Sequence, residues 1–264
     1  MPILSSQRLT QLYKTYAATE VTFNAQVILA SGLVTGDVHL SAGDLHPRSV
    51  LYACSMKGAR IIAEVGDDFP SVLARNGNIA ALHLSFRPHD KAPDLTFFVS
   101  SRVEDLAEYN SKSRRVRFMT LSFEQRPPDI LIGILGTLLE INANAIRRKD
   151  ERIVLTSESM KKIGMESKES CVVFSGTARR CIVRDLSFSG AKILVTASEN
   201  PQSDTRIALK LARCEVKDDN VLDGRIVRVE EVEGRNDVVA LSIHYSSEPP
   251  MKYRQQINAI LPVG

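Results

Sequence analysis

The chain has 264 residues, of which 44% are hydrophobic and 25% are charged, and its formal net charge is +3. These values are typical of a soluble globular protein, and the length favours two domains of ordinary size over one large all-β unit. A pI of about 8.7 permits anionic ligands but lies below the strongly basic range of a dedicated nucleic-acid binder.

Cysteine spacing and apolar runs exclude further classes of protein. The four cysteines have no metal-ligand spacing, and their apolar neighbours predict small core side chains in a reducing cytoplasm. The N-terminus lacks a signal-peptide core, and the longest apolar run, residues 130–139, is shorter than the roughly 20 residues that span a bilayer. We therefore expect a cytoplasmic protein with no metal, no cofactor and no membrane insertion. The cysteines are Cys54, Cys171, Cys181 and Cys214.

The first half of the chain is predicted to be mainly β. An amphipathic helix is expected over residues 5–18, because Leu9 and Leu12 recur at helical spacing behind a Ser5 cap. Segments rich in β-branched and aromatic residues then alternate with turn-forming residues, which favours a barrel or a sandwich. The expected strands cover residues 21–29, 59–65, 79–86, 95–103 and 115–123.

A helix and a basic stretch separate the two halves. Two consecutive prolines precede a helix that is expected from Asp129 to about residue 145. The stretch that follows is polar and basic, and Asn142 and Asn144 weaken its helix propensity. We therefore predict an N-terminal domain over residues 1–141, a linker over 142–152 and a C-terminal domain over 153–264.

The second half repeats the β pattern with short, fairly regular spacing, as in a small barrel. A helix over residues 251–261 follows another pair of prolines and is expected to cap this domain. The expected strands cover residues 153–155, 171–174, 180–184, 191–195, 206–211, 221–229 and 237–245.

Two arginines four residues apart, Arg148 and Arg152, lie in the predicted linker. Each guanidinium carries five donors in a planar fork, which suits phosphate oxygens or the O6/N7 edge of guanine. The spacing alone is weak evidence, because Arg180 and Arg184 repeat it inside a predicted strand, where a solvated sheet face explains both. The linker pair has little role in a core, and such a basic segment could order around a charged ligand.

A second stretch, Asp185 to Gly190, lies between two predicted strands. Asp185 and Ser187 supply acceptor and donor groups on one side of a strand end, and Gly190 lets backbone approach a bulky ligand. An ordinary turn explains this stretch equally well when it is taken alone. Together with the arginine pair, it predicts a pocket for a phosphorylated guanine nucleotide.

The two stretches resemble the signature of PilZ domains that bind cyclic di-GMP, an RxxxR motif on the segment entering a barrel and a [D/N]xSxxG motif on its early strands. Both motifs are complete here. The resemblance covers roughly residues 146–264 and implies a mainly β chain with a six-stranded C-terminal barrel and a C-terminal helix. The first half is similar to the PilZ-like or split-barrel partner domain of flagellar-brake-type proteins. In length and layout, the whole chain resembles the two-domain PilZ proteins of spirochaetes.

The resemblance also implies roles for individual residues in binding cyclic di-GMP. The two motif arginines hold the phosphates and the guanine Hoogsteen edges, while the aspartate and the serine contact guanine and the ligand backbone. The motif glycine leaves room for the base, and the arginine directly before the motif adds a phosphate or stacking contact. The ligand residues implied in this way are Arg147, Arg148, Arg152, Asp185, Ser187 and Gly190.

A bacterial second-messenger receptor is the function that this resemblance implies. Ligand is expected to close the linker over the barrel, reorient the two domains and pass the signal to a flagellar or regulatory protein that controls motility, virulence or gene expression. The alternative is a regulatory protein whose basic surface binds DNA or RNA weakly, with or without ligand control. That surface would comprise Arg114, Arg115, Arg117, Arg179 and Arg180.

Catalysis has little support in the sequence, and we expect that the protein is not an enzyme. The five histidines are scattered, and the pair His89-Asp90 lacks the further ligands of a metal-dependent phosphohydrolase. No P-loop, GxGxxG or nucleophile-elbow pattern is present.

Overall fold

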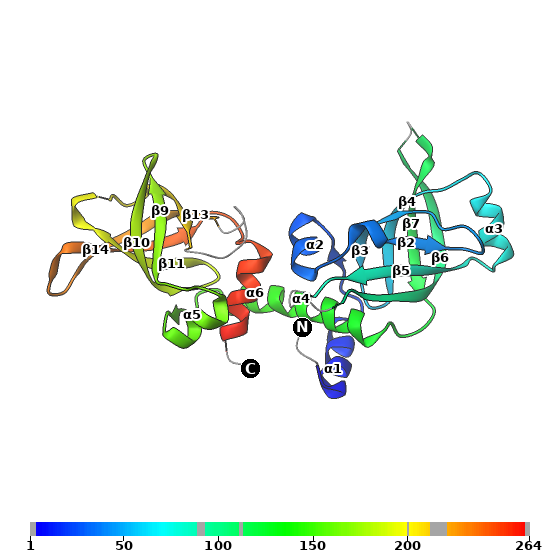
Figure 1. The fold of residues 1–264 in the computed structure, drawn as a ribbon, viewed down its shortest axis with the longest axis horizontal. Helices are drawn as coiled ribbons and strands as arrows, with labels where there is room; N and C mark the ends of the chain where they lie inside the picture. Colours follow the sequence, from blue (N-terminus) through cyan, green and yellow to red (C-terminus); the bar gives the residue numbers. More distant parts are fainter. Residues whose placement is uncertain (1–3, 89–92, 111–112, 200, 212–220, 262–264) are drawn as a thin grey trace. The chain divides into compact units, whose positions relative to one another are not determined.

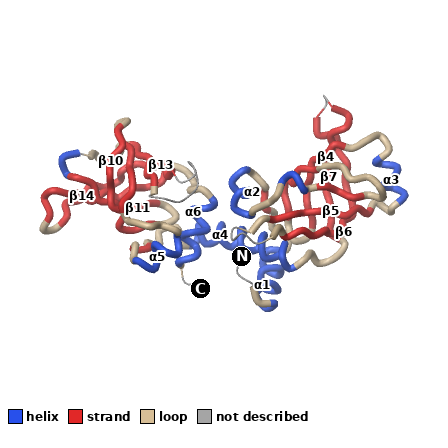
Figure 2. The backbone as a smooth tube through the Cα atoms, viewed as in Figure 1, coloured by secondary structure: helices blue, strands red, loops and turns tan. Residues whose placement is uncertain are grey.

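The computed structural model describes residues 4–88, 93–110, 113–199, 201–211 and 221–261. The chain divides into two compact units, Met1–Glu140 and Ile141–Gly264, each of which is described by itself below. Strands outnumber helices in residues in both units (Figures 1 and 2), so the mainly β prediction is confirmed.

The N-terminal unit is built on a seven-stranded antiparallel sheet with the order β1-β3-β4-β7-β6-β5-β2. Alternate side chains of each strand enter its core; in β4, for example, Ala59, Ile61 and Ala63 are buried. An isolated bridge between His39 and Arg48 connects the start of β2 to the segment before β3. The strands are β1 Val21–Thr22, β2 His39–Ser41, β3 Ser49–Cys54, β4 Gly58–Glu64, β5 Ile79–Phe86, β6 Leu95–Asn110 and β7 Ser113–Phe123.

Short helices interrupt the strands of this unit. The opening helix α1, Ser6–Tyr16, begins where we expected it, because the Ser5 side chain accepts a hydrogen bond from the Arg8 amide. The expected strand over residues 21–29 is wrong beyond Thr22, since the chain turns into α2, Ala25–Ser31. The Asn24 side chain caps α2, and Gly32 ends it in the left-handed conformation. A 3-10 turn η1, Thr35–Asp37, and a helix α3, Phe69–Arg75, complete the unit.

Helix α4, Asp129–Arg147, runs from the end of the N-terminal unit into the C-terminal unit. Most of its large apolar side chains, including Leu131, Ile134 and Leu135, are buried, while Ile130 and Ile146 are exposed. By length and composition alone α4 could cross a membrane, and half of its apolar window is buried inside the structure. The helix also continues through residues 142–147, which we expected to belong to the linker.

The C-terminal unit contains a closed barrel of six antiparallel strands (Figure 1). The ladder runs β11-β14-β13-β12-β9-β10, and the pairing of β10 with β11 closes it. This confirms the six-stranded barrel. The short strand β8, Ile153–Val154, pairs with the end of β10 outside the closed ring. The barrel strands are β9 Glu169–Phe174, β10 Thr177–Leu186, β11 Gly190–Thr196, β12 Arg206–Lys210, β13 Val221–Val232 and β14 Arg235–Tyr245, with a 3-10 turn η2, Ala197–Glu199, after β11.

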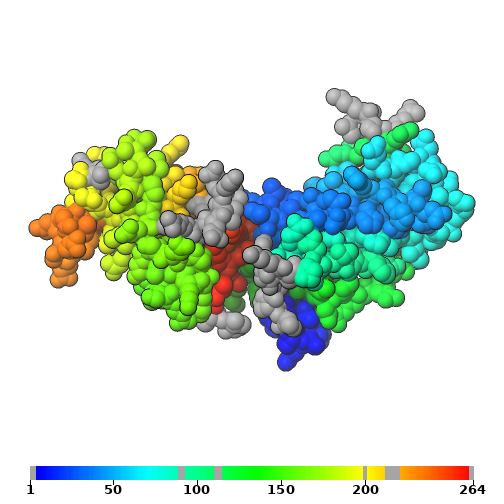
Figure 3. All heavy atoms as spheres, viewed as in Figure 1, coloured from blue at the N-terminus to red at the C-terminus, as the bar shows by residue number. Residues whose placement is uncertain are grey.

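Two helices complete this unit. Helix α5, Ser157–Ile163, begins after Thr156 because Thr156 and Ser159 make a reciprocal capping box. The expected C-terminal helix is present as α6, Met251–Ile260. The Gln256 side chain donates a hydrogen bond of 2.8 Å to the Ile163 carbonyl of α5. Figure 3 accordingly shows the red atoms of α6 beside green atoms of the α5 region.

Candidate functional site

The turn between β10 and β11 is organised by the hydroxyl of Ser187. This oxygen accepts hydrogen bonds from the amides of Gly190, at 3.0 Å, and Ser189, at 3.3 Å, and it donates to the Gly190 carbonyl at 3.1 Å. The Ser187 side chain is fully buried. Its hydroxyl therefore does the work of a turn cap in this structure, and the adjacent Asp185 presents the more accessible polar group.

Gly190 is the position where the turn passes closest to the neighbouring strand β14. A Cβ atom at this position would lie only 2.1 Å from the Ile243 carbonyl oxygen, well inside van der Waals contact. Only glycine therefore allows the turn to enter β11 while β11 stays paired with β14. The resemblance assigned this glycine to making room for a base, and the structure shows that it also makes room for protein backbone.

The arginine-bearing segment lies on this turn because of the strand that follows it. Residue pairs Val154 with Asp185 and Ile153 with Leu186 join β8 to the end of β10, which brings Arg152 next to the turn. The Arg152 Nη1 donates to the Asp185 carboxylate at 2.6 Å, and the Ser189 hydroxyl donates to the Asp150 carboxylate at 2.8 Å. The two predicted motifs are thus in direct contact.

The remaining predicted ligand residues lie at the start of the same segment. Arg147 is the last residue of α4, is exposed, and donates to the Asn144 side chain at 3.1 Å. Arg148 is partly buried, and its Nε lies 2.7 Å from the Glu151 carboxylate. Arg148 therefore already has an anionic partner within its own motif.

The second arginine pair behaves as its strand position predicts. Arg180 and Arg184 are both exposed on β10, outside the buried face of the barrel. They share the spacing of Arg148 and Arg152, but Arg184 directly precedes Asp185, so Arg180 alone provides a control away from the turn.

Two buried tyrosines are linked to the turn by hydrogen bonds. The Tyr253 hydroxyl, on α6, donates to the Ser187 carbonyl at 2.9 Å, and the Tyr245 hydroxyl lies 3.0 Å from that of Tyr253. Burial raises the pKa of both phenols well above the usual tyrosine value, so both stay protonated and can donate. Sequence reasoning missed this support, because a Tyr on a helix face reads as ordinary core.

Helix α6 also holds the end of α4. The buried Arg254 guanidinium donates to the Asn142 side chain at 2.9 Å and to Glu248 at 2.5 Å. The Asn144 side chain donates to Asn258 at 2.7 Å. These amides are the residues whose low helix propensity favoured a linker, and their contacts with α6 explain why α4 continues past them.

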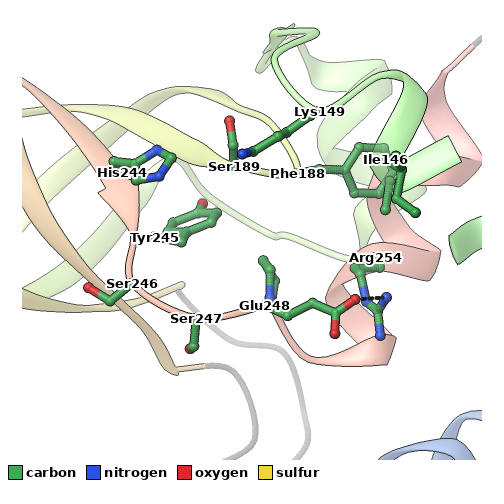
Figure 4. Close-up of a pocket in the computed structure, with 12 residues that line it drawn as sticks. Ile146, Lys149, Phe188, Ser189, His244, Tyr245, Ser246, Ser247, Glu248 and Arg254 are labelled. Atoms are coloured by element: carbon green, nitrogen blue, oxygen red, sulfur yellow. Dashed lines mark hydrogen bonds and ion pairs between the residues drawn. The ribbon is translucent and has the colours of Figure 1, made fainter. Parts of the chain in front are cut away.

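A pocket of about 460 Å³ opens beside the turn (Figure 4). Lys149 and Ser189 border it on the motif side, and His244, Ser247 and Glu248 face them from β14 and the segment before α6. The motif arginines do not line it, and the described pocket extends the site beyond the two motifs. No sequence motif marks its other walls, which come from the end of β14, the segment before α6, the last turn of α4 and Arg254 of α6.

Elsewhere, a histidine group lies on the N-terminal sheet. The rings of His39 and His83 stack with centroids 4.3 Å apart, and His46 lies 6.4 Å from His39. Burial, with repulsion from both neighbours, lowers the pKa of His83. Over the described residues, no group of three His, Cys, Asp or Glu side chains is placed to hold a metal ion. The pair His89-Asp90 and the side chain of Arg114 lie outside the described residues.

The cysteines behave as core residues where they are described. Cys54 and Cys181 are buried, which raises the pKa of both thiols, to about 12 for Cys181. Cys171 is partly buried, and Cys214 lies outside the described residues. Neither buried thiol offers a reactive thiolate near the site.

Known proteins resemble the chain over its whole length. The PilZN3 domain family matches residues 7–142, and the PilZ domain family matches residues 146–261. A cyclic di-GMP binding protein of Treponema denticola is 32% identical over 259 residues, which cover 98% of this chain and 82% of that protein. Among solved structures, PlzA of Borreliella burgdorferi in complex with c-di-GMP is 21% identical, with 97% of this chain and 99% of that chain covered and a TM-score of 0.44. YcgR of Escherichia coli in complex with c-di-GMP is 16% identical, with 96% and 86% covered and a TM-score of 0.29.

Proposed function

The chain belongs to the PilZ family, as a protein that joins a PilZN3 domain to a PilZ domain, and on this premise we propose that it is a receptor for cyclic di-GMP. One observation carries the proposal. The complete RxxxR segment lies directly on the complete DxSxxG turn, held there by the contacts of Arg152 with Asp185 and of Asp150 with Ser189. The relative from Treponema denticola, named as a cyclic di-GMP binding protein, supports the choice of ligand.

The chemistry of this ligand matches the groups on the turn. Cyclic di-GMP carries two phosphates and two guanines, so Arg148 and Arg152 can make charge-assisted bonds to phosphate or to the O6/N7 edge of guanine. The Asp185 carboxylate can accept from guanine N1 and N2 once Arg152 turns to the ligand. The buried Ser187 contributes by holding the turn, and Arg147 adds a charge at the entrance.

We further propose that binding changes the interdomain orientation and that a macromolecular partner reads the change. The motif begins directly after Arg147, the last residue of a helix whose first part belongs to the other unit. Movement of Arg148 and Arg152 toward a ligand would therefore act on the end of α4. A flagellar or regulatory protein is the partner that we propose for this signal, in the cytoplasm and without catalysis.

Calorimetric titration of the full chain with cyclic di-GMP tests the proposal. We expect saturable binding by the wild type and a loss of at least about a hundredfold in affinity for Arg148→Ala/Arg152→Ala, since each lost charged hydrogen bond costs roughly 1.5–3 kcal/mol. Arg180→Ala removes an exposed guanidinium from β10 away from the turn and should bind like the wild type. Absence of binding by the wild type would refute the function, and an equal loss in Arg180→Ala would refute the site.

A further inference from the structure

Two carboxylates lie inside the arginine motif itself, which reads Arg148-Lys-Asp-Glu-Arg152. The residues between the arginines need only span the distance, so their charges are not required by the spacing. Both carboxylates are used in the structure, since Asp150 accepts a hydrogen bond from the Ser189 hydroxyl and Glu151 pairs with Arg148. A neutral amide of the same length could accept a hydrogen bond at either position, but it could not form an ion pair.

The pair between Arg148 and Glu151 occupies the group that the ligand needs. The Arg148 Nε lies 2.7 Å from the Glu151 Oε2, and the two side chains are 17% and 41% exposed. A carboxylate takes up the same planar donor face that a phosphate or a guanine edge would take. Ligand can use the Nε donor of Arg148 only after this ion pair opens.

Glu151 also places a negative charge close to where a dianionic ligand must bind. Charge repulsion between exposed groups acts over about one Debye length, roughly 8–10 Å at physiological salt. Glu151 therefore opposes binding twice, by holding Arg148 and by repelling the phosphates. Asp185 differs, because its carboxylate can itself accept from guanine after Arg152 leaves it.

We propose that Glu151 is an affinity-determining residue of the cyclic di-GMP site, an internal counter-ion that occupies Arg148 until ligand displaces it. The inference rests on the function proposed above. The ligand concentration at which the site is half occupied is then set in part by a residue between the two motif arginines. A neutral side chain at position 151 would make the same pocket respond at lower ligand concentration.

Titration of full-length Glu151→Gln with cyclic di-GMP tests this inference. We expect a Kd that is about three- to tenfold lower than that of the wild type, because an exposed ion pair contributes up to roughly 1 kcal/mol and the screened repulsion adds to it. Tighter binding cannot result from misfolding, so the expected result is distinct from general damage.

Two control variants separate the ion pair from charge alone. Glu158→Gln removes the same charge from a pair with Lys162 on α5, 3.0 Å apart, and should leave the Kd unchanged. Asp150→Asn removes a charge beside position 151 while keeping an oxygen that can accept from Ser189, and should gain less than Glu151→Gln. With added salt, the advantage of Glu151→Gln should shrink, because both of its causes are electrostatic.

The inference is overturned if Glu151→Gln binds like the wild type, or more weakly, while the wild type binds well. Weaker binding would show that Glu151 orients Arg148 for the ligand. Equal gains in Asp150→Asn and Glu151→Gln would also overturn it, since long-range charge would then explain both. No binding by any variant would instead refute the receptor function itself.

Discussion

Single residues at this site serve the fold as well as the proposed binding of ligand. Ser187 is buried as the cap of its turn, and Gly190 is required by the backbone of β14, so the DxSxxG pattern is needed even before a ligand binds. Asp185, Arg148 and Arg152 remain accessible enough to change partners. The motif therefore combines residues that build the turn with residues that exchange ion pairs.

Gly190→Ala should destabilise the C-terminal unit. The added methyl group would overlap the Ile243 carbonyl, and overpacking of this kind costs about 1–3 kcal/mol. Urea unfolding of the full chain measures this loss. Gly36→Ala is the control, since no atom lies within 4 Å of its added Cβ and its stability should change little. An unchanged unfolding midpoint for Gly190→Ala would mean that β11 and β14 separate without cost.

At the scale of elements, hydrophobic and β-branched patterns predicted the barrel strands well. The closed ring needs regular alternation and short turns, both of which are visible in the second half of the sequence. Helices α2 and α5 were missed because their first residues resemble strand or loop, and side-chain caps decided them. In both cases a side-chain cap starts a helix that the residue pattern did not predict.

The candidate site was predictable only in part. Its two motifs could be recognised through their resemblance to the PilZ signature, because the spacing of each is weak evidence when taken alone. The contribution of α6 could not, since Tyr253 and Arg254 meet the turn and α4 only through the tertiary fold. The ion pair of Glu151 also depends on the local backbone after α4, which sequence propensity assigned to a linker.

Tyr253→Phe should weaken both the barrel and ligand binding. It leaves the Ser187 carbonyl and the Tyr245 hydroxyl without their shared partner, and a buried group that loses its partner costs about 1–3 kcal/mol. Tyr245→Phe keeps the bond from Tyr253 to Ser187 and should cost less. Urea unfolding and calorimetric titration of both variants check this order, and a larger loss for Tyr245→Phe would contradict it.

At the scale of the whole molecule, ligand should stabilise the two units unequally. The candidate site lies entirely within Ile141–Gly264, so ligand binding stabilises that unit directly. At a ligand concentration one hundred times the Kd, stabilisation amounts to about 2.7 kcal/mol. Differential scanning calorimetry should therefore show one transition that moves up with cyclic di-GMP and one that moves less. A single transition that moves as a whole would show instead that the units unfold together.

The closing pair of the barrel has a consequence for the order in which the protein folds. The β10–β11 hairpin is local in sequence and forms within microseconds in typical peptides. Strand β14, against which Gly190 packs, comes about fifty residues later, and Tyr253 comes later still. During synthesis the ligand turn is therefore made early but reaches its final geometry only when the last strand and α6 emerge. We expect that a chain ending before α6 would carry both motifs but would not form a site competent to bind the proposed ligand.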